Sequence, residues 1–166
     1  MKKTFFVIII SIFLAGCANG ESIQKFGVKP SNSPELNKKN LQKAIDQMSA
    51  IGGVLYVEPS DTPYHIEGGI ILKKNVSLIG ANAATPRGTS HLTKNQPVGS
   101  VFEITDTENV FITVESATQI KGIQFWYSDQ TTNDPAKIIE YPATIRLSYE
   151  HSTQGVTLNN LTFYGE

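Results

Sequence analysis

The sequence has little of what would mark a small disulfide-rich or nucleic-acid-binding module. It contains one cysteine in 166 residues, which excludes an intramolecular disulfide framework and a cysteine-rich zinc module. Basic charge is not in excess, since 14 lysines and arginines face 15 acidic residues for a net charge of −1. A near-neutral chain has little attraction for phosphate backbones, so we expect no nucleic-acid partner.

Long apolar runs and hairpin signals are scarce as well. After residue 17 no apolar run reaches the length that spans a bilayer. The dipeptides Asn-Gly and Asp-Gly, which favour two-residue hairpins, do not occur after Asn19-Gly20. With 40% hydrophobic residues, the chain can still bury a core, and its length suits one domain or part of a larger one.

The N-terminal residues predict an export signal over residues 1–16. A short basic start precedes the apolar run 5–14, which is too short for a transmembrane helix but suits a signal peptide. Leu14-Ala15-Gly16-Cys17 resembles the bacterial lipoprotein box, which implies that Cys17 is acylated and becomes the mature N-terminus. Residues 17–24 are then a lipid-anchored tether. The alternative is an ordinary secretory signal in which Cys17 is incidental.

One helix is predicted near the start of the mature chain. Ser33-Pro34-Glu35 is a helix-start signal, because serine caps, proline suits the first helical position and glutamate complements the positive helix end. Gly52-Gly53 ends the helix. The residues between them that have helical apolar spacing are Leu41, Ala44, Ile45 and Met48.

Short strands are predicted from residue 54 onward. Runs rich in β-branched and aromatic residues alternate there with Gly, Pro and Asn, and helical periodicity does not return. The predicted strands are Val54–Val57, Ile70–Leu72, Val76–Ile79, Val101–Ile104, Val110–Val114, Ile120–Phe125, Thr144–Leu147 and Val156–Phe163.

A four-residue unit recurs along these strands. It begins with Asn or Gly, and its second and fourth residues are apolar while its third can be any residue. Asn and Gly most readily adopt the left-handed conformation of a sharp corner. Ile120–Phe125 aligns with Leu158–Phe163 at an offset of 38 residues. Stacked turns joined by such corners predict a solenoid, and a β-sandwich of hairpins is the less favoured alternative. The units begin at Asn75, Asn109, Gly122, Gly155 and Asn160.

The order of elements from Ile23 to Asn82 resembles the start of the pectate-lyase superfamily. The resemblance implies an all-β fold over residues 25–166, a right-handed parallel β-helix of about three coils with an N-terminal capping helix. Where the family usually carries an acidic cluster, this chain has Pro30–Asn37, in which Ser33 and Glu35 can share the capping. The matching segments are Lys25–Val28, Leu41–Asp46, Gly52–Pro59, Tyr64–Ile66 and Asn75–Gly80.

No catalytic constellation is visible in the sequence. Relatives act on acidic polysaccharides as lyases, hydrolases or epimerases, with their catalytic groups on middle coils, and others are tailspikes or adhesins. Hydrolysis needs two facing carboxylates, and lyase chemistry needs a base with a cation or metal. His65, His91 and His151 lack metal-ligand spacing. We therefore assign no catalytic residue, metal or cofactor, and expect a truncated frame or a fragment that ends within the repeat pattern.

A sugar-binding surface is predicted on the loop from Trp126 to Ile138, together with the strand and turn that carry Arg146, Glu150 and His151. Trp126 and Tyr127 can stack on a sugar ring, and Asp129 can bond its hydroxyls. Arg146, one of two arginines, can pair with a uronate carboxylate. The alternative is that Trp126 packs under its own loop and Arg146 is a solvated strand residue.

Two functions remain open at this point. The chain is either the N-terminal part of an exported polysaccharide lyase or glycoside hydrolase, inactive alone, or a non-catalytic β-helix that binds glycan or supports an adhesin. A remnant gene product without activity is a weaker third. The expected partners are a polysaccharide, with uronate-containing chains as one candidate, and a bacterial envelope membrane (outer membrane or cell surface). An open last coil also predicts self-association and marginal stability.

Overall fold

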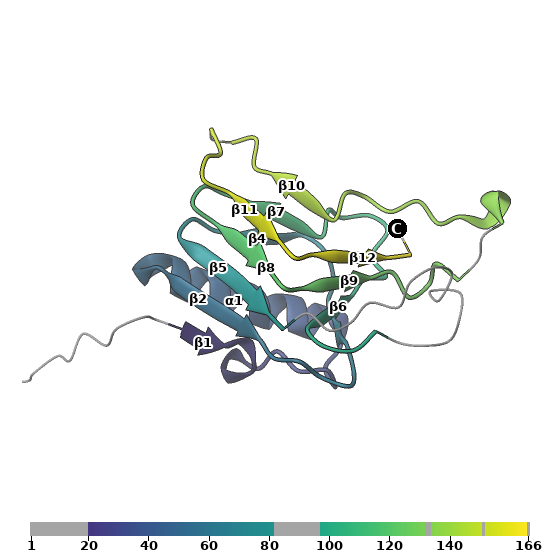
Figure 1. Ribbon diagram of the computed structural model, residues 1–166, viewed down its shortest axis with the longest axis horizontal. Coiled ribbons are helices and arrows are strands. Elements are labelled where there is room, and N and C mark those ends of the chain that lie inside the picture. Colours follow the sequence, from purple (N-terminus) through teal and green to yellow (C-terminus); the bar gives the residue numbers. More distant parts are fainter. Residues whose placement is uncertain (1–19, 82–96, 132–133, 151, 166) are drawn as a thin grey trace, which may run out of the picture.

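A computed structural model describes residues 20–81, 97–131, 134–150 and 152–165 (Figure 1). The predictions for residues 1–19, including Cys17, and for His91 and His151 lie outside these residues. The described residues form one α-helix, α1 (Pro34–Ile51), the short 3-10 helices η1 (Ile23–Phe26) and η3 (Pro135–Lys137), and twelve strands: β1 (Gly20–Ser22), β2 (Gly53–Val57), β3 (Tyr64–His65), β4 (Ile70–Leu72), β5 (Val76–Gly80), β6 (Val101–Glu103), β7 (Ile112–Val114), β8 (Gln119–Lys121), β9 (Gln124–Trp126), β10 (Ile145–Leu147), β11 (Thr157–Asn159) and β12 (Thr162–Tyr164).

The strands form three sheets, and every pairing between described strands is parallel. The sheet orders are β1-β2-β5-β8-β11, β4-β7-β10 and β3-β6-β9-β12. From β2 onward the chain visits the three sheets in the same rotation, so each strand from β2 to β9 lies beside the strand whose number is higher by three. Hairpins would give antiparallel pairs, so the sandwich of hairpins is excluded for the described strands.

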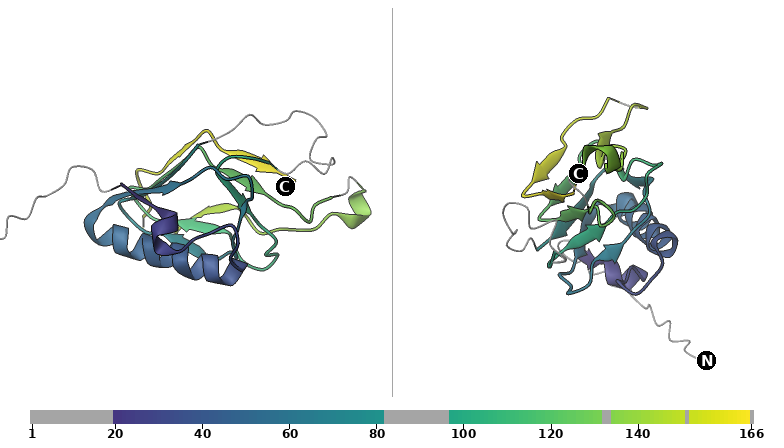
Figure 2. Two further views of the ribbon diagram at one scale, coloured as in Figure 1. Left: turned by 90° about the horizontal axis from the view of Figure 1, so that it is seen from below. Right: turned by 90° about the vertical axis from the view of Figure 1, so that its right-hand side faces the viewer.

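Helix α1 lies across the end of the molecule that carries β1 and β2 (Figures 1 and 2). The Ser33 Oγ accepts a hydrogen bond from the Leu36 N–H at 3.3 Å, and Gly52 ends the helix with φ 73°. Both helix boundaries were predicted, and the predicted apolar face is buried against the core. The polar side chain of Gln42 also bonds the backbone N–H and C=O of Ile71, at 2.9 and 3.1 Å, which covers the free edge of β4.

The core consists of side chains stacked in columns from one strand to the next. The parallel register places Phe102, Phe125 and Phe163 in one column, and the rings of Phe125 and Phe163 stack with centroids 5.2 Å apart. The predicted offset of 38 residues is confirmed, since Leu158 pairs with Ile120 as Phe163 pairs with Phe125.

Four of the five predicted corners have the left-handed backbone. Asn75, Gly122, Gly155 and Asn160 have φ between 51° and 68°, while Asn109 does not. The corners at Gly122 and Asn160 divide each of the predicted strands Ile120–Phe125 and Val156–Phe163 into two. Asn and Gly therefore favour the left-handed corner without being required for it, since Ala117 adopts it too, with φ 55°.

Residues 20–24 of the segment predicted as a tether belong to the folded part of the chain. Gly20–Ser22 pairs with β2 as strand β1, and Ile23 is buried in the core. The Ser22 Oγ accepts from the Gln24 N–H at 3.0 Å and begins η1. The folded part of the chain therefore includes Gly20, five residues before the predicted boundary.

Candidate functional site

A groove with a volume of about 590 Å³ lies on the outer face of the sheet β4-β7-β10. Its floor is a row of three aligned residues, Ile71, Thr113 and Arg146, whose neighbours Ile70 and Leu72 point into the core. The groove is lined along β7 by Glu108, Asn109 and Val110 of the turn before this strand, by Thr113 on it, and by Glu115 directly after it. A segment of extended polymer fits such an open groove better than a small ligand does.

An arginine and an exposed tyrosine form one wall of the groove. The guanidinium carbon of Arg146 lies 5.6 Å from the ring centroid of Tyr149, and Arg146 Nη2 donates to the Thr113 Oγ1 at 3.3 Å. The Tyr149 residue is 85% exposed. The guanidinium lies over one face of the ring, and the rest of the ring presents a flat apolar area to solvent.

Three carboxylates share this groove with the single arginine. Glu108, Glu115 and Glu150 all line it, and the Glu115 Oε2 accepts from the backbone N–H of Lys74 at 3.0 Å. Ionised carboxylates are acceptors only, so they suit the hydroxyl groups of a ligand. With Arg146 the lining carries acceptors, a planar donor and an aromatic surface.

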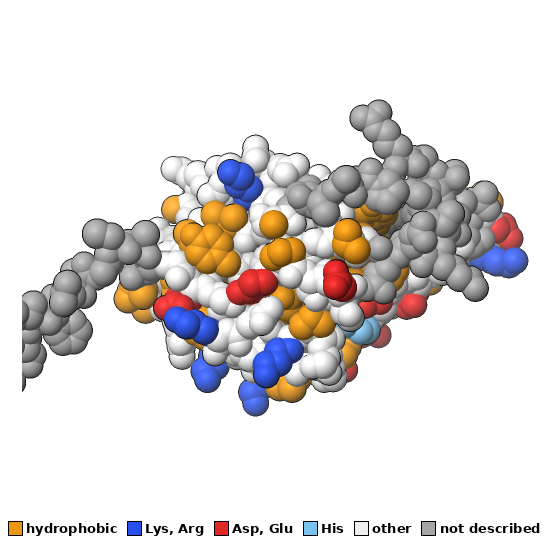
Figure 3. Space-filling model, turned by 60° about the horizontal axis from the view of Figure 1, so that its bottom comes forward, with side chains coloured by type: hydrophobic (Ala, Val, Ile, Leu, Met, Phe, Trp, Pro, Cys, Tyr) orange, Lys and Arg blue, Asp and Glu red, His pale blue; other side chains and the backbone are white. Residues whose placement is uncertain are grey.

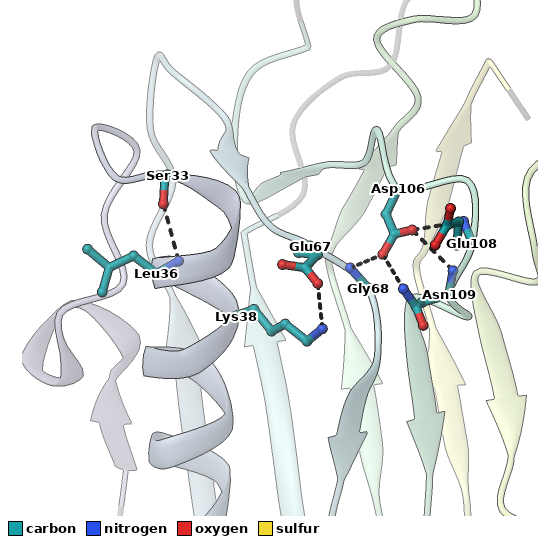
Figure 4. Close-up of polar contacts among 8 residues, drawn as sticks. All are labelled: Ser33, Leu36, Lys38, Glu67, Gly68, Asp106, Glu108 and Asn109. Carbon is teal, nitrogen blue, oxygen red and sulfur yellow. Dashed lines mark hydrogen bonds and ion pairs between the residues drawn. The ribbon is translucent and has the colours of Figure 1, made fainter.

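Asp106 fixes the turn that carries Glu108 to the groove (Figure 4). Its Oδ1 accepts from the backbone N–H groups of Glu108 at 2.8 Å and Asn109 at 3.1 Å. Its Oδ2 accepts from the Gly68 N–H at 3.1 Å and the Asn109 Nδ2 at 3.0 Å. One side chain thereby joins the segment before β4 to the turn before β7.

The same contacts set the charge state and the packing of this turn. Burial alone would raise the pKa of Asp106, but the hydrogen bonds from Glu108, Asn109 and Gly68 outweigh it and lower the pKa below its ordinary value. A β-carbon on Gly68 would lie 2.9 Å from the Asn109 carbonyl oxygen and 3.0 Å from the Asp106 Oδ2. Glycine at position 68 is thus required by the close approach of the turn.

The four predicted sugar-binding residues do not form one surface. Arg146 lines the groove, but Trp126 lies on β9 in a different sheet, and neither Trp126, Tyr127 nor Asp129 lines the groove. Trp126 is half-buried and Asp129 is exposed. Only Arg146 among them is placed beside other groups that suit a sugar.

Tyr127 is a core residue. It is 1% exposed, and its hydroxyl hydrogen-bonds the Thr144 Oγ1. Its ring packs on that of Tyr141 with centroids 4.6 Å apart. Burial raises the pKa of Tyr141, and the nearby Asp129 charge raises it further. The ring of Tyr127 therefore has no free face on which a sugar could stack.

The described residues contain no group of three or more His, Cys, Asp or Glu side chains placed to hold a metal ion. His65, the only described histidine, has its Nε2 2.8 Å from the Thr105 Oγ1. In the same part of the chain, no helix is both long and apolar enough to cross a bilayer.

Comparisons with known proteins give no match. No protein-family model, no curated protein and no solved structure matches this chain. The resemblance to the pectate-lyase superfamily and the lipoprotein signal remain predictions from the sequence.

Sequence reasoning missed most of the groove. Glu108 and Glu115 lie before and after β7, whereas Tyr149 follows β10, and only the pairing of these two strands brings the three residues to one face. One signal was present in Asp106-Thr107-Glu108-Asn109, because an Asp followed closely by Asn favours a turn closed by the Asp side chain. That signal marks the turn, although it does not reveal the groove.

Proposed function

We propose that this chain is an exported lipoprotein whose folded part is a right-handed parallel β-helix that binds a polysaccharide along the sheet β4-β7-β10. The rotation of the chain through three parallel sheets supports the β-helix. Right-handedness follows from the general rule that nearly all crossovers between parallel strands of one sheet are right-handed.

The export and anchoring proposal depends on residues 1–17. A basic start, a short apolar run and a cysteine after small residues suit a signal peptide followed by acylation of Cys17. Acyl chains on this residue would hold the protein on a bacterial envelope membrane, the outer membrane or the cell surface. Mass spectrometry of the mature N-terminus tests this directly, since acylation adds a fixed mass to Cys17.

The observation that carries the binding proposal is the exposed Tyr149 ring beside Arg146 in a groove lined by carboxylates. An aromatic ring offers an apolar face to the C–H surface of a sugar, while the guanidinium donates and the carboxylates accept hydrogen bonds from hydroxyl groups. The open shape suits a chain that continues beyond the groove at both ends.

The charge of the groove narrows the class of sugar. Three glutamates, Glu108, Glu115 and Glu150, face one arginine, so a densely charged polyuronate is repelled. Arg146 can still accommodate one uronate carboxylate through two parallel hydrogen bonds. We infer a mainly uncharged polysaccharide, with a uronate tolerated at the position that contacts Arg146.

A glycan-binding screen with matched variants tests this proposal. Tyr149→Ala should abolish binding to any glycan that the unchanged protein retains. Tyr56→Ala is the control, because Tyr56 is also an exposed tyrosine but lies on β2, outside the groove. Equal binding by both variants would exclude Tyr149 as a contact, and binding only to polyuronates would exclude the inferred sugar class.

The alternative function is enzymatic cleavage of a polysaccharide, which would use the same carboxylates. Glycoside hydrolysis uses two carboxyl groups flanking the bond, and Glu108, Glu115 and Glu150 line one groove. We expect no release of reducing ends or unsaturated products from polygalacturonate or alginate by this chain. Turnover that Glu108→Gln or Glu150→Gln abolishes would favour the enzyme instead.

A further inference from the structure

The exposed side of α1 lies beside the point where the described chain begins. Gly20 is the register partner of Val54, three residues after the end of α1 at Ile51. Cys17 is three residues before Gly20, and an extended chain covers at most about 3.6 Å per residue. A lipid on Cys17 would therefore lie at most about 11 Å from Gly20, which is beside Val54 and so close to the C-terminal end of α1.

The side chains at this end suit a lipid–water interface. Ile51 is 65% exposed although it is a large apolar residue. Lys43, Gln47 and Ala50 are exposed on α1 at spacings of four and three residues, so they lie along one face. Lys74 is exposed next to the helix, where the Ser49 Oγ donates to its carbonyl oxygen at 3.1 Å. Figure 3 shows basic, acidic and apolar side chains together on the face that includes the bottom of Figure 1.

The charge at this end is basic once its ion pairs are counted. Asp46 pairs with Lys73 at 2.9 Å, and Glu21 pairs with Lys25. Lys43 and Lys74 make no ion pair with a described residue. The opposing charge is Glu115, whose carboxylate accepts from the Lys74 N–H. Two lysines without ion pairs beside an exposed isoleucine match the chemistry of anionic lipid headgroups above acyl chains.

We propose that the C-terminal half of α1, with Ile51, Lys43 and Lys74, rests on the surface of an anionic bilayer and fixes the orientation of the protein there. The inference rests on the proposed acylation of Cys17. Ile51 enters the headgroup region, and the two lysines contact anionic phosphates. The groove, on the outer face of β4-β7-β10, then has a fixed direction relative to the membrane.

A depth measurement on the acylated protein tests this orientation. Acylation consumes the thiol of the only native cysteine, so Ile51→Cys provides a single site for an environment-sensitive fluorophore. Ile138→Cys is the matched control, because Ile138 is a similarly exposed isoleucine, at 53%, that follows η3 at the opposite end of the molecule in Figure 1. The protein is placed in vesicles of phosphatidylethanolamine and phosphatidylglycerol.

In these vesicles the fluorophore at position 51 should shift to the blue and resist iodide quenching, while the one at position 138 should stay accessible. Equal quenching at both positions on acylated, vesicle-bound protein would overturn the orientation and leave the anchor intact. Mass spectrometry of the same sample shows separately whether Cys17 is acylated, so failure of the anchor is distinguished from failure of the orientation.

A chain that begins at Ala18 tests the surface without the lipid, and it keeps every described residue. It should partition onto phosphatidylglycerol vesicles more than onto phosphatidylcholine vesicles. Lys74→Ala should weaken this partitioning about fivefold, while Lys137→Ala, at the C-terminal end of η3, should not change it. Equal partitioning onto the two kinds of vesicle, or an equal loss of partitioning in the two variants, would contradict the proposal.

Discussion

The first and last turns of strands differ in what covers them, although the same residue types occupy their inward positions. A turn of strands is one passage of the chain through the three sheets, so β2, β3 and β4 form the first turn and β10, β11 and β12 the last. At the first turn, β1 pairs with β2, and α1 bonds the backbone of the other strands through Asn37 and Gln42. At the last turn, no described strand pairs with the outer edges of β10, β11 and β12. The consequence appears in single columns of side chains.

One column shows the difference directly. Leu55, Leu78 and Ile120 are completely buried, while Leu158, next in register, is 49% exposed. Phe102 and Phe125 are likewise buried, while Phe163 is 43% exposed. Position within a turn therefore directs a side chain inward, but only a neighbouring turn buries it.

The largest expected loss of stability comes from truncating Phe125, the inner member of the column that Phe102, Phe125 and Phe163 form. Phe125 contacts the rings of Phe102, Phe111 and Phe163, so Phe125→Ala should lower the free energy of unfolding by about 3–5 kcal/mol. Phe163→Ala should cost about 1–2 kcal/mol, since half of the burial is missing. Urea unfolding of both variants measures the difference, and equal losses would break the comparison.

A smaller effect is expected at Asp106, which ties Gly68 of the first turn to Asn109 of the second. Asp106→Ala should lower the free energy of unfolding by about 2 kcal/mol, because it removes charge-assisted hydrogen bonds. The pKa of Asp106 is lower in the folded state, so its contribution is present above its unfolded pKa of about 3.9 and is lost as pH falls through the folded value.

Acid titration of the unfolding free energy checks this assignment. The unchanged protein should lose more stability than Asp106→Ala does as the pH falls below about 4. An identical acid dependence in the two proteins would show that Asp106 is not responsible. Asp61→Ala is a suitable control, because Asp61 is an exposed aspartate outside this turn.

The corners should give a third, smaller contrast. Asn75 has φ 64° between two covered turns, and Asn160 has φ 51° in the last turn. Asn75→Ala should cost about 1 kcal/mol, because a β-carbon without a polar group is strained in the left-handed region. Asn75→Gly should restore most of that loss. The same pair of changes at Asn160 should have a smaller effect on thermal unfolding, and an equal effect would contradict the contrast.

The smallest effect on stability is expected from a charge on the uncovered face. Leu158→Lys should change the free energy of unfolding by less than about 1 kcal/mol, since the side chain is already half in solvent. It should also reduce the self-association that we expect from uncovered strand edges. Light scattering over a range of concentrations measures this. If the unchanged protein is a monomer at all concentrations, the uncovered strand edges do not cause the self-association that we expect.

Sequence reasoning succeeded where the cause is local. The bounds of α1 follow from Ser33 and Gly52, and the corners at Asn75 and Asn160 follow from their tolerance of the left-handed backbone. The 38-residue offset identified a true register pair, because equal side chains stack best in a column.

The site was less predictable because it depends on register and burial. The sequence places Tyr127 at the start of a polar loop, which predicts an exposed ring. In the structure the ring packs on Tyr141 and its hydroxyl bonds Thr144, so the side chain is buried. Arg146 was identified by its chemistry, but its partner Tyr149 was not, since a lone tyrosine in a loop carries no signal of its own. A groove formed by three turns exists only after the turns are stacked.

Paired cysteines test the parallel stacking of turns most directly. Gln119 and Thr157 are register partners on β8 and β11, at the Cα separation of neighbouring strands, roughly 5 Å, which a disulfide can bridge. With Cys17 acylated or replaced by serine, Gln119→Cys with Thr157→Cys should oxidise to an internal disulfide, while Lys121→Cys with Thr157→Cys should not. Cross-linking of the second pair in preference to the first would contradict the parallel register from which the core columns and the groove are built.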